Sequence, residues 1–318
     1  PPRSTLFPYT TLFRSLVMII RKRSPFGRAE TSFSPEPDKA ITAVELSGED
    51  HKVILSLTDD TWKVNREYDA RKSAITFFLR VLREIRIKSP VSPEMFSDEI
   101  VAKGIRPVRV EIYENRKLLR SFYVYRTTSN KYGNIMKIKE KSKPFIIHFP
   151  GFEGDIGSVF NPNELFWKPH TLFNLLPSEI SSIALDNYSD TTSSFRIETA
   201  GNNFNLLDLS KPLTGWDSSR VRRYISYFTL VPFESWAFEM TENERSELSA
   251  QKPLFRISVR QSDGKNTVLT LLERFNDGEK DTGRLWGKTG DNEEYMIIRY
   301  SDIDPLLRKL NYFYPEDE

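Results

Sequence analysis

Two acidic residues separated by a single glycine, Glu153 and Asp155, come closest in this sequence to a paired-carboxylate site. Paired carboxylates act as acid and base in glycoside hydrolysis, and grouped carboxylates bind calcium. No Asp-x-Asp-x-Asp-Gly loop surrounds this pair. A catalytic pair also needs a cleft whose neighbours perturb its pKa values, so the pattern favours two solvated side chains. A carboxylate-dependent hydrolase at this place is an alternative function.

The same segment carries glycines at i, i+3 and i+6, namely Gly151, Gly154 and Gly157. Glycines after a strand are typical of loops that bind phosphate, but such loops read GxGxxG or end in Gly-Lys-Ser/Thr. Neither pattern occurs here, and the neighbouring carboxylates would repel a phosphate. The glycines therefore predict a turn between two modules, with a positive φ angle at one or more of them.

Histidine and cysteine offer little for catalysis or metal binding. The chain has three histidines, His51, His148 and His170, and no cysteine. The histidines form no ligand-spaced pair such as HExxH, and a site needs a constellation of groups. The absence of cysteine excludes disulfides, a thiolate nucleophile and cysteine-based metal sites. We therefore predict no catalytic, metal-binding or cofactor-binding residues, and no cofactor.

Tryptophan is the remaining residue type that could recognise a ligand. Expected strand and helix positions explain most of the five tryptophans as core residues, but not Trp167. This residue lies between the two predicted modules, where loops held by rigid elements often carry function. We predict an interaction connector with Phe152, Glu153, Asp155 and Trp167 as contact residues. A carbohydrate- or peptide-binding site at this connector is a further alternative.

Two amphipathic helices organise the rest of the chain, within residues 69–89 and 217–235. Apolar side chains at i, i+3, i+4 and i+7 mark one face of each helix. They are Ile75, Phe78, Leu79 and Leu82 in the first helix, and Val221, Tyr224, Ile225 and Phe228 in the second. Asp69 and Asp217 precede the helices and are expected to cap them. Leu79 and Ile225 should be buried at matching positions, while Arg80 and Ser226 face outward.

Strand patterns around the helices repeat as well. Period-2 segments over 41–46, 52–57 and 61–64 precede the first helix, and four more, at 108–113, 119–125, 134–139 and 145–149, follow it. Three correspondences align the second copy. In this alignment, residues 180–185 correspond to 41–46, residues 256–259 to 109–112, and residues 297–300 to 146–149. The pattern predicts an α+β protein of two tandem similar modules, each an antiparallel sheet with one main amphipathic helix.

The expected domain organisation begins with a segment foreign to the fold. Residues 1–15 match the in-frame translation of a sequencing adapter and contribute two arginines and no acid. The chain has 46 basic and 44 acidic residues, so the remainder is formally neutral and gives no support for a nucleic-acid partner. Residues 16–23 are expected to be the end of a membrane helix, or else a tail, and 24–39 a linker. The modules are placed at 40–150 and 179–318, with the connector at 151–178.

The order of several segments resembles the bacterial domain-of-unknown-function 4340 family. These segments are TWKVN, then a helix, RIKSPVSPE, FIIHFPGFEG and PSEISSIAL. The resemblance implies one N-terminal membrane helix, a short linker and a repeated α+β region. It also implies a place in the bacterial inner membrane with the C-terminal region extracytoplasmic, and a protein partner in the envelope such as a transporter component. From this we expect a non-catalytic, membrane-anchored interaction or scaffold module, accessory to transport.

Overall fold

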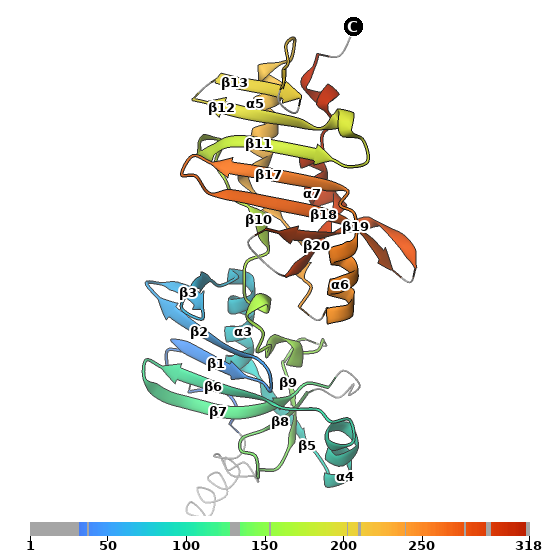
Figure 1. Ribbon diagram of the computed structural model, residues 1–318. Helices are drawn as coiled ribbons and strands as arrows, with labels where there is room; N and C mark the ends of the chain where they lie inside the picture. The colour runs from blue at the N-terminus through green and yellow to red at the C-terminus, as the bar shows by residue number, and fades with distance from the viewer. Residues whose placement is uncertain are drawn as a thin grey trace, which may run out of the picture. The chain divides into compact units, whose positions relative to one another are not determined.

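The computed structural model describes residues 32–36, 38–127, 134–152, 154–201, 203–208, 211–238, 240–276, 278–290 and 294–315. The chain divides into two compact units, and the boundary lies between Pro169 and His170 (Figure 1). The predicted adapter segment, 1–15, and the predicted membrane segment, 16–23, lie outside the described residues. Within the described part of the chain, no helix is both long enough and apolar enough to cross a bilayer.

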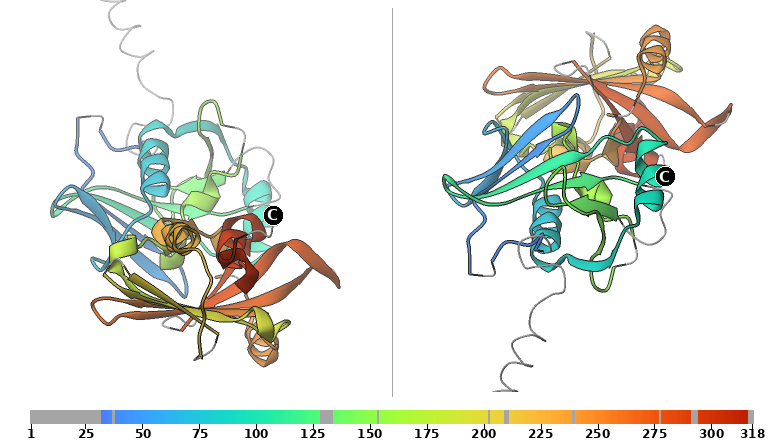
Figure 2. Two further views of the ribbon diagram at one scale, coloured as in Figure 1. Left: turned by 90° about the horizontal axis from the view of Figure 1, so that it is seen from above. Right: turned by 90° about the horizontal axis from the view of Figure 1, so that it is seen from below.

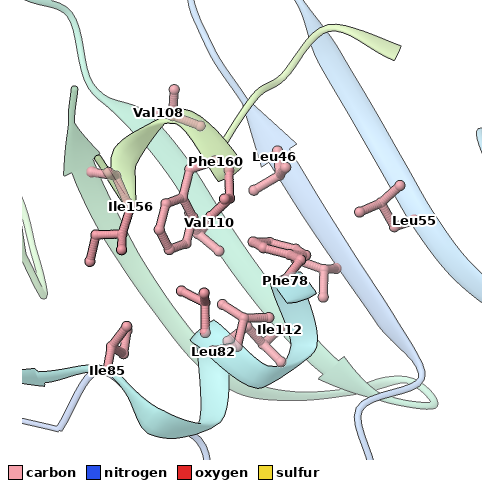
Figure 3. Packing of buried hydrophobic residues seen from close by; sticks show 14 of the residues in the cluster. Leu46, Leu55, Phe78, Leu82, Ile85, Val108, Val110, Ile112, Ile156 and Phe160 are labelled. Atoms are coloured by element: carbon pink, nitrogen blue, oxygen red, sulfur yellow. The ribbon is translucent and has the colours of Figure 1, made fainter. Parts of the chain in front are cut away.

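The first unit is built on an antiparallel sheet with nine strands in its described part. In spatial order they are β4 (Tyr68–Asp69), β3 (Thr61–Val64), β2 (Lys52–Thr58), β1 (Ala43–Ser47), β6 (Val108–Glu114), β7 (Lys117–Tyr125), β8 (Asn134–Lys137), β9 (Phe145–His148) and β5 (Arg86–Pro90). The main helix α3 (Lys72–Glu84) covers one face of this sheet. Phe78 and Leu82 of the helix point toward Val110 and Ile112 of β6 (Figure 3).

The second unit repeats this arrangement strand for strand. Its nine-stranded sheet has the order β14 (Lys211–Pro212), β13 (Asn203–Asp208), β12 (Phe195–Ala200), β11 (Ile180–Asn187), β17 (Phe255–Gln261), β18 (Asn266–Asn276), β19 (Glu279–Thr289), β20 (Tyr295–Arg299) and β16 (Ser235–Trp236). The main helix α5 (Ser218–Ser226) lies along one face, as does the short α7 (Tyr300–Ile303) (Figure 2). A separate two-stranded ribbon joins β10 (Thr171–Phe173) to β15 (Val231–Pro232).

Residue pairing across the strands confirms the duplication. Val44 lies opposite Ile112 in the first sheet, as Ile183 lies opposite Val259 in the second. Further pairings extend the equivalence to both edges of the sheets. They match Trp62 with Phe204, Ile147 with Ile298, and Ser89 with Ser235. The predicted α+β fold with two tandem similar modules is therefore correct.

The register predicted between the two helices is wrong. Leu79 is only partly buried, whereas Ile225 is buried in the second core. A shift of three residues gives a better match, because every pair is then buried. The pairs are Phe78 with Val221, Val81 with Tyr224, Leu82 with Ile225, and Ile85 with Phe228. Arg80 and Ser226 are both exposed, as predicted.

The helix caps also differ from each other. Asp217 is the N-cap of α5, and its carboxylate accepts a hydrogen bond from the Ser219 amide at 2.7 Å. Asp69 does not cap α3, although its position in the sequence suggested it. It belongs to the edge strand β4 and pairs with Lys63 at 2.6 Å, while Arg71 occupies the N-cap position. The helix starts later because residues 68–69 complete a strand pair.

The predicted linker and connector are partly incorporated into the cores. Phe33, placed in the linker by sequence, is buried against Phe122 and Phe145. Residues 151–169 belong to the first unit, and residues 170–178 belong to the second. Ile156 and Phe160 close over the first core beside α3 (Figure 3). Phe33, Ile156 and Phe160 thus complete the first core, although they lie in segments without an apolar period.

A second helical segment lies at the same topological place in both units. In the first unit, α4 (Pro93–Phe96) and a π-helix (Ser97–Val101) connect β5 to β6. In the second unit, α6 (Glu242–Ala250) connects β16 to β17. Figure 2 shows α6 on the face of its sheet opposite α5. The corresponding face of the first sheet has its own small cluster, separate from the main core, with Ile100 and Tyr125 among its residues.

Candidate functional site

Asp155 holds a turn in place with its carboxylate. One carboxylate oxygen accepts hydrogen bonds from the Gly157 amide at 2.8 Å and from the Asn134 side-chain amide at 2.9 Å. A Cβ atom at Gly157 would lie 2.2 Å from Asn134 Oδ1, so only glycine fits there. Gly151 has a φ of 77°, in agreement with the predicted turn. Glu153, the other half of the predicted pair, lies outside the described residues.

Trp167 is a core residue. Its side chain is 0% exposed, and its indole N–H donates to the carbonyl of Asn161 at 2.8 Å. The ring lies 4.9 Å from that of Phe78 on α3, between ring centroids. The prediction that Trp167 is available to a partner is therefore wrong, because its surface and its only polar hydrogen are already used in packing.

Phe152 and Asp155 are the described contact residues of the predicted connector that the structure leaves accessible, and Phe152 is the aromatic one. Its side chain is 40% exposed, while its ring contacts Phe77 at 5.5 Å and Phe149 at 6.1 Å between centroids. The guanidinium of Arg80 lies 5.1 Å from the centre of the Phe149 ring. We call Phe77, Arg80 and Phe152, which are at least partly accessible and rest on the buried ring of Phe149, the Phe152 surface. Aromatic rings and arginine are the side chains most enriched at the centres of protein interfaces.

Gly154 lets the Phe152 ring fold back on its own loop. A Cβ atom at residue 154 would lie 2.6 Å from the Phe152 ring. A side chain there would displace the ring, because contacts below 3 Å between carbon atoms are strongly repulsive. Glycine at residue 154 thus helps to hold Phe152 against Phe77 and Phe149.

A polar pocket of about 460 Å³ lies in the second unit beside α6. Four residues of α6 at i, i+3, i+4 and i+7 line it, together with one residue of β19, the first residue of β20 and the residue before it. The lining residues are Glu242, Arg245, Ser246, Ser249, Lys288, Glu294 and Tyr295. The spacing on α6 is that of one helix face. This face carries charges and hydroxyl groups instead of apolar side chains.

Charges of both signs meet in the pocket. Arg245 forms an ion pair with Glu294 at 2.7 Å and a longer one with Glu242 at 3.9 Å. The ammonium group of Lys288 lies 5.1 Å from the centre of the Tyr295 ring. Burial raises the pKa of the Tyr295 phenol, while Arg245 acts in the opposite direction. Tyr295 therefore stays protonated near neutral pH and can donate a hydrogen bond.

The helix α6 forms without an apolar face because its N-terminus is well capped. Thr241 and Glu244 make a reciprocal capping box, in which the Thr241 amide donates to Glu244 at 2.7 Å. This hydrogen bond is the main cause that lowers the pKa of Glu244. The T-x-x-E pattern is visible in the sequence and could have predicted the helix. No helix was expected at these residues, and the pocket residues were not among the predicted site residues.

The three histidines lie far apart in the secondary structure. His51 is exposed between β1 and β2, and His148 ends β9 opposite Arg86. His170 precedes β10 and stacks on Phe233, with 5.1 Å between ring centroids. Among the described residues, no group of three His, Asp or Glu side chains is arranged to hold a metal ion.

No protein-family profile matches this chain, and no curated protein matches it.

Proposed function

We propose that this protein is a non-catalytic interaction module, and that its first unit binds a protein partner through the Phe152 surface. The observation that carries the proposal is that Phe152 is accessible and ordered at the same time. It is 40% exposed, yet its ring packs against the rings of Phe77 and Phe149 in the same unit. An aromatic side chain that is already ordered loses little conformational freedom when a partner covers it.

The charges around this surface suit a protein interface. Arg80 extends over Phe149 and also pairs with Glu84 at 3.1 Å, so both charges lie beside the aromatic rings. An apolar centre with polar residues at its edge is the usual composition of a protein interface. Most of the binding energy would come from the aromatic residues, with the charges contributing to specificity.

The location and the kind of partner follow from the resemblance to the domain-of-unknown-function 4340 family. On this basis we propose an inner-membrane protein with one N-terminal anchor and an extracytoplasmic C-terminal region. Its partner would be another envelope protein, such as a transporter component. A carbohydrate- or peptide-binding site or a hydrolase in the connector has less support. The Asp155 carboxylate already accepts a hydrogen bond from the Gly157 amide, and Trp167 is buried.

Site-specific crosslinking can test this proposal. A photoreactive phenylalanine analogue replaces Phe152 in the full chain expressed in its own host, and adducts are separated by mass. Leu118 on β7 is the control, since it is an exposed apolar residue of the same unit. We expect one protein adduct from position 152 that is weak or missing from position 118. Gly154→Ala should reduce this adduct, because it displaces the ring.

Two results would contradict the proposal. Equal adducts from positions 152 and 118 would indicate nonspecific contact. If position 152 gives no protein adduct although the chain is folded and present at normal levels, no partner binds at the Phe152 surface. Membrane fractionation of the same cells tests the anchor separately, since an anchored chain sediments with the membranes and resists extraction by high salt.

A further inference from the structure

Lys137 and Lys288 are equivalent residues in the two units. Lys137 on β8 lies opposite Tyr123 of β7, and Lys288 on β19 lies opposite Thr270 of β18. Both belong to the sheet face that carries the second helical segment of the unit. The surroundings of the two lysines differ because those helical segments differ.

In the first unit, aromatic rings cover the lysine. The ammonium group of Lys137 lies 4.0 Å from the centre of the Phe96 ring and 5.9 Å from that of Tyr125. Burial is the main cause that lowers the pKa of Lys137, and Glu140 acts in the opposite direction. Apolar residues from α4, the π-helix and the sheet pack around this place, among them Ile100 and Ile135.

In the second unit, the described residues around the lysine include no counterpart of the Phe96 and Tyr125 rings. Leu272 replaces Tyr125 in the strand register, and the polar face of α6 takes the place of the segment that carries Phe96. Lys288 instead contacts the ring of Tyr295 on β20, and it lines the pocket of about 460 Å³. Pockets of this size accommodate small organic ligands.

We propose that this pocket binds a small zwitterion, a free amino acid or a short peptide with a free C-terminus. The carboxylate of the ligand would pair with Lys288 and accept a hydrogen bond from Ser246, because the Ser249 hydroxyl already donates to the carbonyl of Ser246 at 2.8 Å. Its ammonium group would pair with Glu242, whose side chain is 95% exposed and contacts Arg245 only at 3.9 Å. This site is separate from the Phe152 surface and does not depend on the function proposed for it.

The charge of the lining favours a zwitterion over a polyanion. Arg245 and Glu294 neutralise each other at 2.7 Å, which leaves one cation, Lys288, and one anion, Glu242. A ligand with one charge of each sign can pair with both. A phosphate group would carry almost two negative charges at neutral pH into a lining that is formally neutral, and the two glutamates would oppose it.

Thermal unfolding of the full chain with added ligands tests the proposal. The probes are the twenty free amino acids and a set of dipeptides, each dipeptide compared with its C-terminal amide. A ligand that binds the folded state raises its stability, so we expect at least one probe to raise the melting temperature in a saturable way. The corresponding amide should have little effect, because it lacks the carboxylate.

Variants at the two equivalent lysines provide the matched comparison. Titration calorimetry with the best probe should show that Lys288→Met weakens binding about tenfold or more, the usual effect of losing a charged hydrogen bond. Lys137→Met, at the same place in the first unit, should leave the affinity unchanged. Ser246→Ala should weaken binding less, and circular dichroism verifies that each variant is folded.

Several outcomes would overturn the proposal. It fails if no probe gives a saturable shift, or if amides bind as well as free carboxylates. It also fails if Lys288→Met and Lys137→Met have the same effect on affinity. Tighter binding of inorganic phosphate than of any zwitterion would replace the proposed ligand with an oxyanion.

Discussion

Asn134 and Leu285 occupy the same position in the two sheets, Asn134 opposite Ile147 and Leu285 opposite Ile298. Both are buried. A core position is polar in the first unit because the amide of Asn134 donates to Asp155 and so attaches the following segment to the sheet. The two units share one fold but differ in the segments that pack against the sheet at this position.

Asp155→Ala should destabilise the first unit by about 1–3 kcal/mol, because it leaves the buried amide of Asn134 without its acceptor. Ser158→Ala is the control, since its hydroxyl is accessible and donates to the carbonyl of Asp155. We expect a change within about 0.5 kcal/mol for the control. Urea unfolding measures both. Equal effects of the two variants would show that the carboxylate does not stabilise this turn.

The helix register found in the structure can be tested by truncating core residues. Leu82→Ala and Ile225→Ala should each cost about 2–5 kcal/mol, since both side chains are buried at equivalent places. Leu79→Ala should cost less, because its side chain is already partly in water. Amide hydrogen exchange, measured peptide by peptide, identifies the unit in which each variant speeds up exchange. A larger loss for Leu79 than for Leu82 would favour the register predicted from sequence.

Asp217→Ala should lower the melting temperature, because the N-cap carboxylate accepts from the Ser219 amide. That bond is the main cause that lowers the pKa of Asp217 below its ordinary value of 3.8. The stabilisation is therefore present above pH 3.8 and is lost as the pH falls through the lower pKa of the folded state. Asp69→Ala, at a residue that caps no helix, should have a smaller effect at pH 7. Melting curves at several pH values compare the two variants.

Tyr224→Phe should reduce stability by about 1–3 kcal/mol, because it leaves the carbonyl of Leu306 without its donor. Burial raises the pKa of Tyr224 far above its ordinary value of 10.0. The folded state thus favours the protonated phenol, and this contribution is lost as the pH rises above 10. Between pH 8 and 11, the range around that ordinary value, the free energy of unfolding should fall less steeply with rising pH for the variant than for the unmodified protein. Parallel curves for both proteins would contradict this.

Local patterns in the sequence were sufficient to predict most strands, the two main helices and the duplication, but the helix α6 was not predicted. Apolar residues with a period of two or of 3.6 identify strands and helices, since burial on one face requires that spacing. The three segment matches at 41–46, 109–112 and 146–149 agree with the strand pairing. The helix register failed because Leu79 and Val81 are both apolar, and the side chain that faces the core depends on how α3 lies on its sheet.

Sequence patterns were thus enough to predict the α+β class, the two modules and most strands. Which residues form a surface or a pocket depends on the three-dimensional packing. Trp167 and Phe152 are both aromatic residues in a segment without periodicity, yet one fills the core and the other stays exposed. Arg245 and Lys288 are 43 positions apart and meet only when α6 lies beside β19. Such contacts depend on long-range packing, which the residue types of a short segment do not encode.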